Sequence, residues 1–138
     1  MVETSSEWAR LRAGHELQPL WLMISEAANE RYWQSAGVDH PLLRAGALYP
    51  PIAANLTILC LQQTVPDAMI QTRQGLKCHR AAQAGVELVT TGLIVNRYLK
   101  RGRDYIDVEA IVRTADAPKK ILWESSVTFT PTATLGVA

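Results

Sequence analysis

The fold is decided by the stretch Pro51-Ile52-Ala53-Ala54-Asn55-Leu56-Thr57-Ile58-Leu59-Cys60-Leu61-Gln62-Gln63. Proline suits the first turn of a helix, where its missing N–H is not needed, so Pro51 predicts a helix start. Apolar residues recur at helical spacing and also occupy the other faces of this helix. A helix that is hydrophobic nearly all round is expected to be buried nearly all round. The rest of the chain must therefore surround residues 52–63, and Pro66-Asp67 ends the segment.

Downstream of this helix the sequence is typical of β-strands. Period-two alternation places Ile106, Val108, Ala110 and Val112 on one face. Gly75 predicts a bulge, and the segments predicted as strands are 69–73, 76–80, 86–95, 105–112 and 121–129. Turn residues between the later strands favour consecutive antiparallel pairing. The predicted fold class is α+β, a curved antiparallel sheet of about five strands wrapped around a long central helix.

The chain before residue 51 predicts a strand, a helix and a loop within the same single domain, residues 1–138. Residues 20–24 indicate a buried strand. Ser25 is a good N-cap for a helix over 27–34, which Gly37 ends. Ala28 and Tyr32 are four residues apart and are expected on its buried face. Prolines and glycine make 38–51 an irregular loop, and the ends, 1–6 and 132–138, are expected to fray.

Composition excludes several classes of protein. The 138 residues are 48% hydrophobic and 20% charged with a formal charge of +1, which fits a globular domain and argues against nucleic-acid binding. The cluster Lys100, Arg101 and Arg103 is interpreted as a solvated turn. Cys60 and Cys78 are expected to be buried free thiols. No membrane span or secretory signal is visible, so we expect a cytoplasmic protein without membrane partners.

Several local sequences, in order, resemble the MaoC-like branch of the hot-dog fold, the family of (R)-specific enoyl-CoA hydratases and related acyl dehydratases. The resemblance covers residues 14–131. It rests on Gly14-His15-Glu16-Leu17, Tyr32-Trp33-Gln34-Ser35-Ala36-Gly37-Val38-Asp39-His40-Pro41, Tyr49-Pro50-Pro51-Ile52-Ala53-Ala54-Asn55, Ala84-Gly85-Val86-Glu87-Leu88 and the run over 95–105. It implies the hot-dog fold and a substrate that is an acyl thioester, carried by CoA or by an acyl carrier protein.

The residues that would carry the family's chemistry differ in this chain. In active hydratases the loop resembles S-G-D-x-N-P-x-H, and its Asp and His act together on the water that adds to the enoyl thioester. An alignment without gaps puts Val38 at the Asp position and Leu43 at the His position. Valine and leucine cannot transfer protons. The family's His-Gly at the central helix becomes Ala54-Asn55.

Two residues of the same loop could supply a shifted dyad. Asp39 and His40 are the candidate catalytic acid and base, although adjacent residues in extended backbone point opposite ways. The alternative is that Asp39 caps a local turn and His40 makes a structural hydrogen bond.

Four further residues are candidates for substrate binding. Asn55 could orient the acyl carbonyl, with Ala54 beside it, or could be a polar residue satisfied within the fold. Arg44 could meet a phosphate and Tyr49 could line an acyl tunnel, or both could be ordinary loop residues.

These observations lead to three hypotheses for function. The first is an acyl-thioester-binding protein with its usual dyad replaced, a hydro-lyase if active. The second is a non-catalytic partner of an active hot-dog dehydratase. The chain is expected to form a homodimer or a heterodimer with another hot-dog chain. The third is an acyl-CoA thioesterase, ranked last because residues 52–63 contain no carboxylate. No metal or other cofactor is expected.

Overall fold

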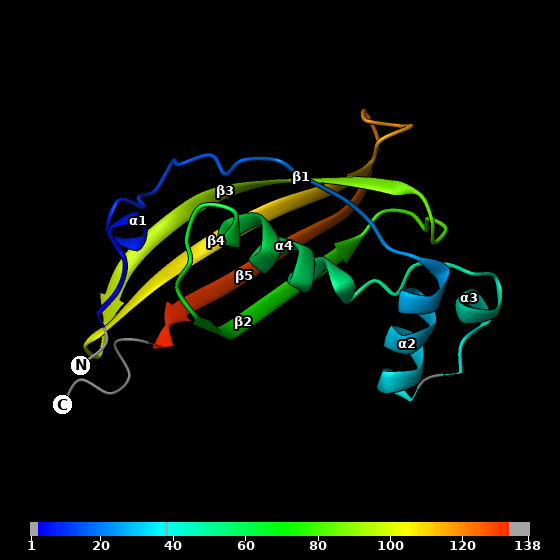
Figure 1. The fold of residues 1–138 in the computed structure, drawn as a ribbon, viewed down its shortest axis with the longest axis horizontal. Coiled ribbons are helices and arrows are strands. Elements are labelled where there is room, and N and C mark those ends of the chain that lie inside the picture. The colour runs from blue at the N-terminus through cyan, green and yellow to red at the C-terminus, as the bar shows by residue number, and fades with distance from the viewer. Residues whose placement is uncertain (1–2, 38, 133–138) are drawn as a thin grey trace.

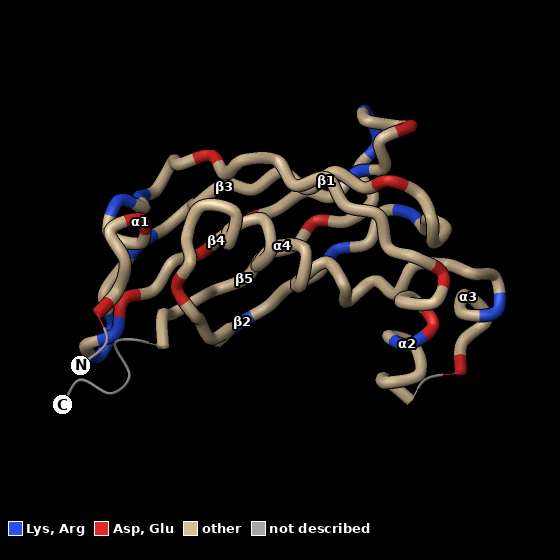
Figure 2. Tube along the Cα trace, viewed as in Figure 1, with Lys and Arg blue, Asp and Glu red and all other residues tan. Residues whose placement is uncertain are grey.

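The central helix α4 (Ile52–Gln62) lies against one face of an antiparallel sheet (Figure 1). The structure, a computed structural model, describes residues 3–37 and 39–132. Pro51 is the N-cap of α4, and no Lys, Arg, Asp or Glu occurs along the helix (Figure 2). The predicted burial is confirmed for most of the helix. It is wrong for Asn55, which is exposed, and for Leu59, which is 43% exposed.

The sheet has five strands, β1 (Leu20–Met23), β2 (Met69–Cys78), β3 (Glu87–Lys100), β4 (Arg103–Thr114) and β5 (Ile121–Pro131). Their order in space is β1-β3-β4-β5-β2. The predicted consecutive pairing is therefore correct for β3, β4 and β5 and wrong for the rest, because β2 pairs with β5 and β1 with β3. The two strands that flank α4 in the chain thus form opposite edges of the sheet, which lets the sheet curve around both sides of the helix.

Alternation along the strands separates an inner face, toward α4, from an outer face. Ile106, Val108, Ala110 and Val112 are all buried on the inner face, as predicted. The predicted bulge at Gly75 is wrong, since the register of β2 shifts between Gln71 and Arg73. At residue 75 a Cβ atom would come within 2.9 Å of the Ser126 Oγ. A close approach between strands therefore explains that glycine.

The strand β1 and the helix α2 (Glu26–Ala36) bury different residues than the sequence predicts. Trp21 and Met23 are 59% and 56% exposed, so the prediction of a buried strand is wrong and β1 is an edge strand. Ser25 caps α2 by accepting the Ala28 N–H, and Gly37 ends it in the left-handed conformation, as predicted. The buried residues are Asn29 and Trp33 rather than Ala28 and Tyr32. The predicted irregular loop contains a short helix, α3 (Pro41–Arg44).

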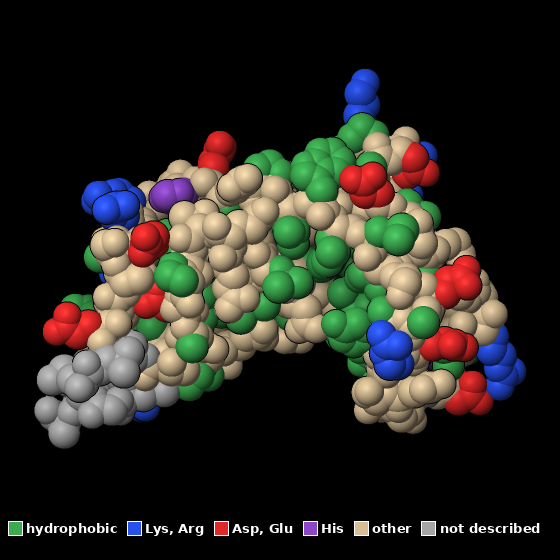
Figure 3. Space-filling view, viewed as in Figure 1, with side chains coloured by type: hydrophobic (Ala, Val, Ile, Leu, Met, Phe, Trp, Pro, Cys, Tyr) green, Lys and Arg blue, Asp and Glu red, His purple; other side chains and the backbone are tan. Residues whose placement is uncertain are grey.

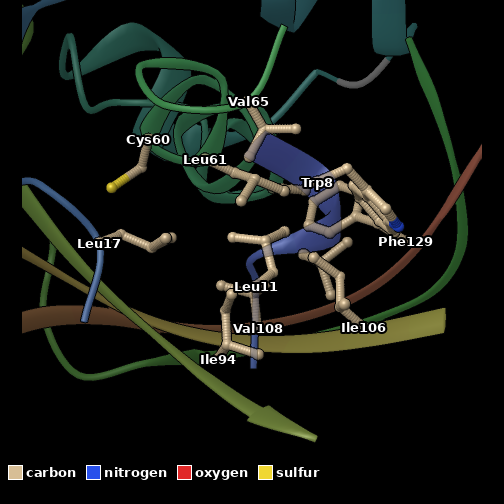
Figure 4. Packing of buried hydrophobic residues seen from close by; sticks show 12 residues of the cluster. Trp8, Leu11, Leu17, Cys60, Leu61, Val65, Ile94, Ile106, Val108 and Phe129 are labelled. Carbon is tan, nitrogen blue, oxygen red and sulfur yellow. The ribbon is translucent and has the colours of Figure 1, made fainter. Parts of the chain in front are cut away.

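A short N-terminal helix, α1 (Ser6–Ala9), closes one end of the core with Trp8 (Figure 4). Trp8 is fully buried in a cluster that includes Leu61 of α4 and Phe129 of β5. Its Nε1–H donates to Asp104 Oδ2 at 2.9 Å, and Asp104 also pairs with Arg97 at 2.7 Å. Arg97 in turn donates to the backbone carbonyls of Trp8, Ala9 and Leu11. One arginine thus fixes this segment to the sheet.

Within the segments expected to fray, Ser5 and Thr132 are held to the rest of the fold by hydrogen bonds. Ser5 donates its backbone N–H and its hydroxyl to the Asp67 carboxylate, and Ser6 begins α1. Thr132 donates its N–H to the Ala68 carbonyl at 2.9 Å. Residues 1–2 and 133–138 lie outside the described residues.

The two cysteines have different environments. Cys60 on α4 is fully buried, and burial raises the pKa of its thiol to about 11 because the thiolate would lose its solvation. Cys78 is exposed at the end of β2, so the prediction that both thiols are buried is wrong for Cys78. Within residues 3–37 and 39–132 no helix is long and apolar enough to cross a membrane.

We expect Trp8→Ala to lower the free energy of unfolding by about 3–5 kcal/mol, because a large buried ring is lost and Asp104 loses a donor. Chemical denaturation followed by circular dichroism measures this. Leu99→Ala is the control, since Leu99 is 78% exposed and its loss should cost less than about 0.5 kcal/mol. Equal effects of the two substitutions would show that α1 does not contribute to the core.

Candidate functional site

The predicted site residues lie where α2, α3 and the N-terminal turn of α4 come together. On this side of the molecule hydrophobic side chains gather in the hollow between α4 and the lobe that contains α2 (Figure 3). The lobe is attached by Asn29, whose amide donates to the Ala47 carbonyl at 2.8 Å and accepts the Tyr49 N–H at 2.9 Å. Trp33 Nε1–H also donates to Ala47, at 2.9 Å. Buried polar groups of α2 thus hold the chain that leads into α4.

Aromatic rings pack together where α2 meets the chain that leads into α4. The rings of Trp33 and Tyr49 meet edge to face at 4.9 Å between centroids. The His40 ring stacks on the Trp33 ring, with 6.1 Å between their centroids and an interplanar angle of 17°. Such pairs stabilise the packing beyond the area they bury. Tyr49 is half-buried, three residues before the start of α4, and packs against the core.

The side chains of Asp39 and His40 are engaged with other partners. The Asp39 carboxylate pairs with Arg44 at 2.9 Å, and both side chains are about three-quarters exposed. His40 Nδ1 accepts the Leu42 N–H at 3.1 Å and so caps α3. Since Nδ1 is the acceptor, the neutral ring carries its proton on Nε2 and can donate there.

Within the described part of the chain, no hydrogen bond joins Asp39 to His40. The expected structural hydrogen bond of His40 is present, and Asp39 forms an ion pair instead of a turn cap. Their catalytic role stays a prediction. Val38, which aligns with the family's Asp, lies outside the described residues.

The N–H groups at the start of α4 already have acceptors. Ile52, Ala53 and Ala54 donate to the carbonyls of Tyr49, Pro50 and Pro51 at 3.0–3.3 Å. Ala54 itself is buried against the core. Asn55, by contrast, is exposed, and its Nδ2 lies 3.4 Å from the hydroxyl oxygen of Tyr32. The Asn55 amide is therefore an accessible donor at this end of the helix.

Asn29 is the structurally important residue here that the sequence interpretation did not identify. Asn29 comes four residues before Trp33 and so lies on the same face of the helix. This spacing could have indicated that Asn29 is buried together with Trp33. Among residues 3–37 and 39–132 no group of three or more His, Cys, Asp or Glu could hold a metal ion.

Comparison with known proteins gives structural similarity without sequence similarity. No family model and no curated protein sequence matches the chain. The HadBC (3R-hydroxyacyl-ACP dehydratase) complex from Mycobacterium tuberculosis aligns over 87% of this chain and 97% of that one, with a TM-score of 0.70 and 16% identity. The (R)-hydratase PhaJ1 from Pseudomonas aeruginosa aligns over 90% and 84%, with a TM-score of 0.70 and 14% identity.

A third similar structure is the F36A mutant of the fluoroacetyl-CoA-specific thioesterase FlK, with a TM-score of 0.65, 9% identity and 87% of both chains covered. The chain thus has the hot-dog fold found in MaoC-like dehydratases and (R)-hydratases. This confirms the fold class and the fold-level resemblance that the sequence predicts.

We expect Asn29→Ala to lower the free energy of unfolding by about 1–3 kcal/mol, because it leaves the partly buried N–H of Tyr49 without its acceptor. Asp39→Asn is the control, since an exposed ion pair contributes less than about 1 kcal/mol. Urea denaturation of both variants gives the comparison. A larger loss in Asp39→Asn than in Asn29→Ala would contradict this account of how α2 is attached.

Proposed function

We propose that the protein binds an acyl thioester in the hollow between α2 and α4, and that the family's usual Asp/His dyad is replaced. The observation that carries the proposal is the exposed amide of Asn55 on α4 beside Tyr32 on α2. These two helices border the apolar hollow seen in Figure 3. Two of the three similar structures are named for acyl thioesters, 3R-hydroxyacyl-ACP and fluoroacetyl-CoA. Either CoA or an acyl carrier protein would fit this proposal.

In the proposed complex the Asn55 Nδ2 donates to the thioester carbonyl. The backbone N–H groups of Ile52, Ala53 and Ala54 contribute less, because they already donate to carbonyls of the preceding turn. Tyr49 contacts the acyl chain, with Trp33 behind it. Arg44 lies at the exposed rim and attracts a phosphate of the carrier. That phosphate competes with the Asp39 carboxylate for the Arg44 guanidinium.

Hydration of a trans-2-enoyl thioester needs a base that takes a proton from water and an acid that protonates the α-carbon. Asp39 and His40 are the candidate general acid and base. The group that takes the proton from water can return it to the α-carbon, so that the hydroxyl and the proton added to the double bond both come from one water. Asp39 would have to leave Arg44 to share one water with His40, whose Nε2 is not used in the hydrogen bond with the Leu42 N–H. Slow hydration or none is therefore the expected behaviour, and binding is the main proposed activity.

We expect any hydration of crotonyl-CoA to fall by about 100-fold or more in Asp39→Ala and in His40→Ala, because each removes a proton-transfer group. Loss of the enoyl absorbance measures the rate. Glu30→Gln, an exposed substitution on α2, is the control and should leave the rate unchanged. Activity that survived both alanine substitutions would contradict the assignment of Asp39 and His40.

A second candidate function is that of a non-catalytic partner for a hot-dog chain with an intact dyad. The observation that favours it is the free edge of β2, ten residues long. Ile70 and Leu76 on this strand are partly exposed, and so is Leu59 of the adjoining α4. A long edge strand with apolar side chains is suited to pairing with another chain. The HadBC dehydratase is likewise a complex.

We expect the chain to form a dimer through β2, either alone or with an active hot-dog chain, and Ile70→Lys and Leu59→Lys each to weaken it by about tenfold or more. Sedimentation velocity of the chain alone and of the mixture measures this. Leu99→Lys is the control, because Leu99 is highly exposed on β3, away from that edge. A stable homodimer with full hydratase activity would contradict the partner function.

The thioesterase hypothesis ranks lowest. Hot-dog thioesterases often use a carboxylate on or near the central helix, and α4 carries none. The likeness to FlK shows the shared fold only.

A further inference from the structure

The outer face of the sheet, opposite α4, carries a groove of about 740 Å³ that crosses all of its central strands. None of the predicted site residues lines this groove. The pairing register places Glu16, Leu93, Glu109 and Ser126 next to one another in a row across neighbouring strands. Because directly paired residues share a face, this whole row points outward.

An apolar patch extends from the groove to the β1 edge. We define this outer-face patch as Trp21, Met23, Val89, Leu93 and Ile111, which the register places on the same outward face. Trp21 and Met23 are more than half exposed, and Leu93 is 38% exposed. Tryptophan and methionine are enriched in the centres of protein interfaces, and tryptophan often carries much of the binding energy. The patch therefore has the composition of an interface centre.

Negative charge borders the patch. Glu16 and Glu109 lie on either side of Leu93, and Glu87 pairs in register with Met23. Among the described residues these three carboxylates take part in no ion pair, whereas Glu124 in the groove pairs with His79 at 2.6 Å.

The cations near the groove and the patch include Arg113, in register with Val89, and Lys77, in register with Glu124. Arg73, in register with Thr128, lies further along the same face and lines a second groove with Glu109. Two copies meeting through the same patch would bring like charges together, which disfavours self-association. Charge complementarity favours a partner that presents basic residues around an apolar face.

We propose that the outer-face patch docks a basic amphipathic segment of a protein partner. The apolar side of that segment packs on Trp21, Met23 and Leu93, and its Lys or Arg side chains pair with Glu16, Glu87 and Glu109. This surface lies on the opposite side of the sheet from α4, so it does not depend on thioester binding.

The test uses the complete chain and two labelled helical peptides, one built from Leu and Lys and one with the same Leu pattern and Glu in place of Lys. Fluorescence anisotropy measures binding. We expect the Leu/Lys peptide to bind and Trp21→Ser to weaken it by about tenfold or more. Leu99→Ser, which changes a more exposed apolar residue at the end of β3, should change the affinity by less than about twofold.

The charge requirement is tested separately. Glu16→Gln combined with Glu109→Gln should weaken binding and flatten its dependence on salt, whereas Glu30→Gln on α2 should do neither. Equal binding of the two peptides, absence of binding, or equal losses in Trp21→Ser and Leu99→Ser would overturn the proposal. Self-association that Trp21→Ser abolishes would also overturn it, because the patch would then belong to a second copy of the chain.

Discussion

The burial of α4 against the inner face of the sheet is the constraint on which the rest of the structure depends. The helix carries no charge, and burial of its apolar side chains stabilises the fold through the hydrophobic effect. The polar side chain in its buried middle, Thr57, donates to the Ala53 carbonyl at 2.8 Å and lies 2.9 Å from the Ser125 hydroxyl. A satisfied hydroxyl of this kind costs little, so the helix can be covered by β3, β4 and β5 along its length.

This constraint also determines where the helix is left open. The sheet covers most of α4 but leaves Asn55 and Leu59, which are four residues apart, exposed along one side. At its beginning the helix is approached by α2, which Asn29 and Trp33 hold against Ala47. The proposed thioester site and the proposed partner surface both follow from this incomplete coverage. The outer-face patch does not follow from this coverage. It exists because α4 covers only the inner face of the sheet and leaves the outer face open.

Local features of the fold could be predicted because they depend on neighbouring residues. Ser25 and Gly37 bound α2 through short-range backbone geometry, and the alternation over 105–112 identified the inner face of β4 directly. The strand order could not be predicted, since it depends on how β1 and β2 pass around α4. The hydrogen-bond and ion-pair partners of the site residues could not be predicted either. Asp39 meets Arg44 only because α3 forms between them, and Asn29 is buried by a segment eighteen residues further along the chain.

The most direct test of the central claim is hydrogen–deuterium exchange with and without a saturating concentration of butyryl-CoA, which cannot be hydrated. The account predicts slower exchange at residues 49–55 and around Tyr32, where the hollow lies beside the beginning of α4. Protection confined to the outer face of the sheet, or no change anywhere, would contradict the claim that this hot-dog fold binds acyl thioesters at α4.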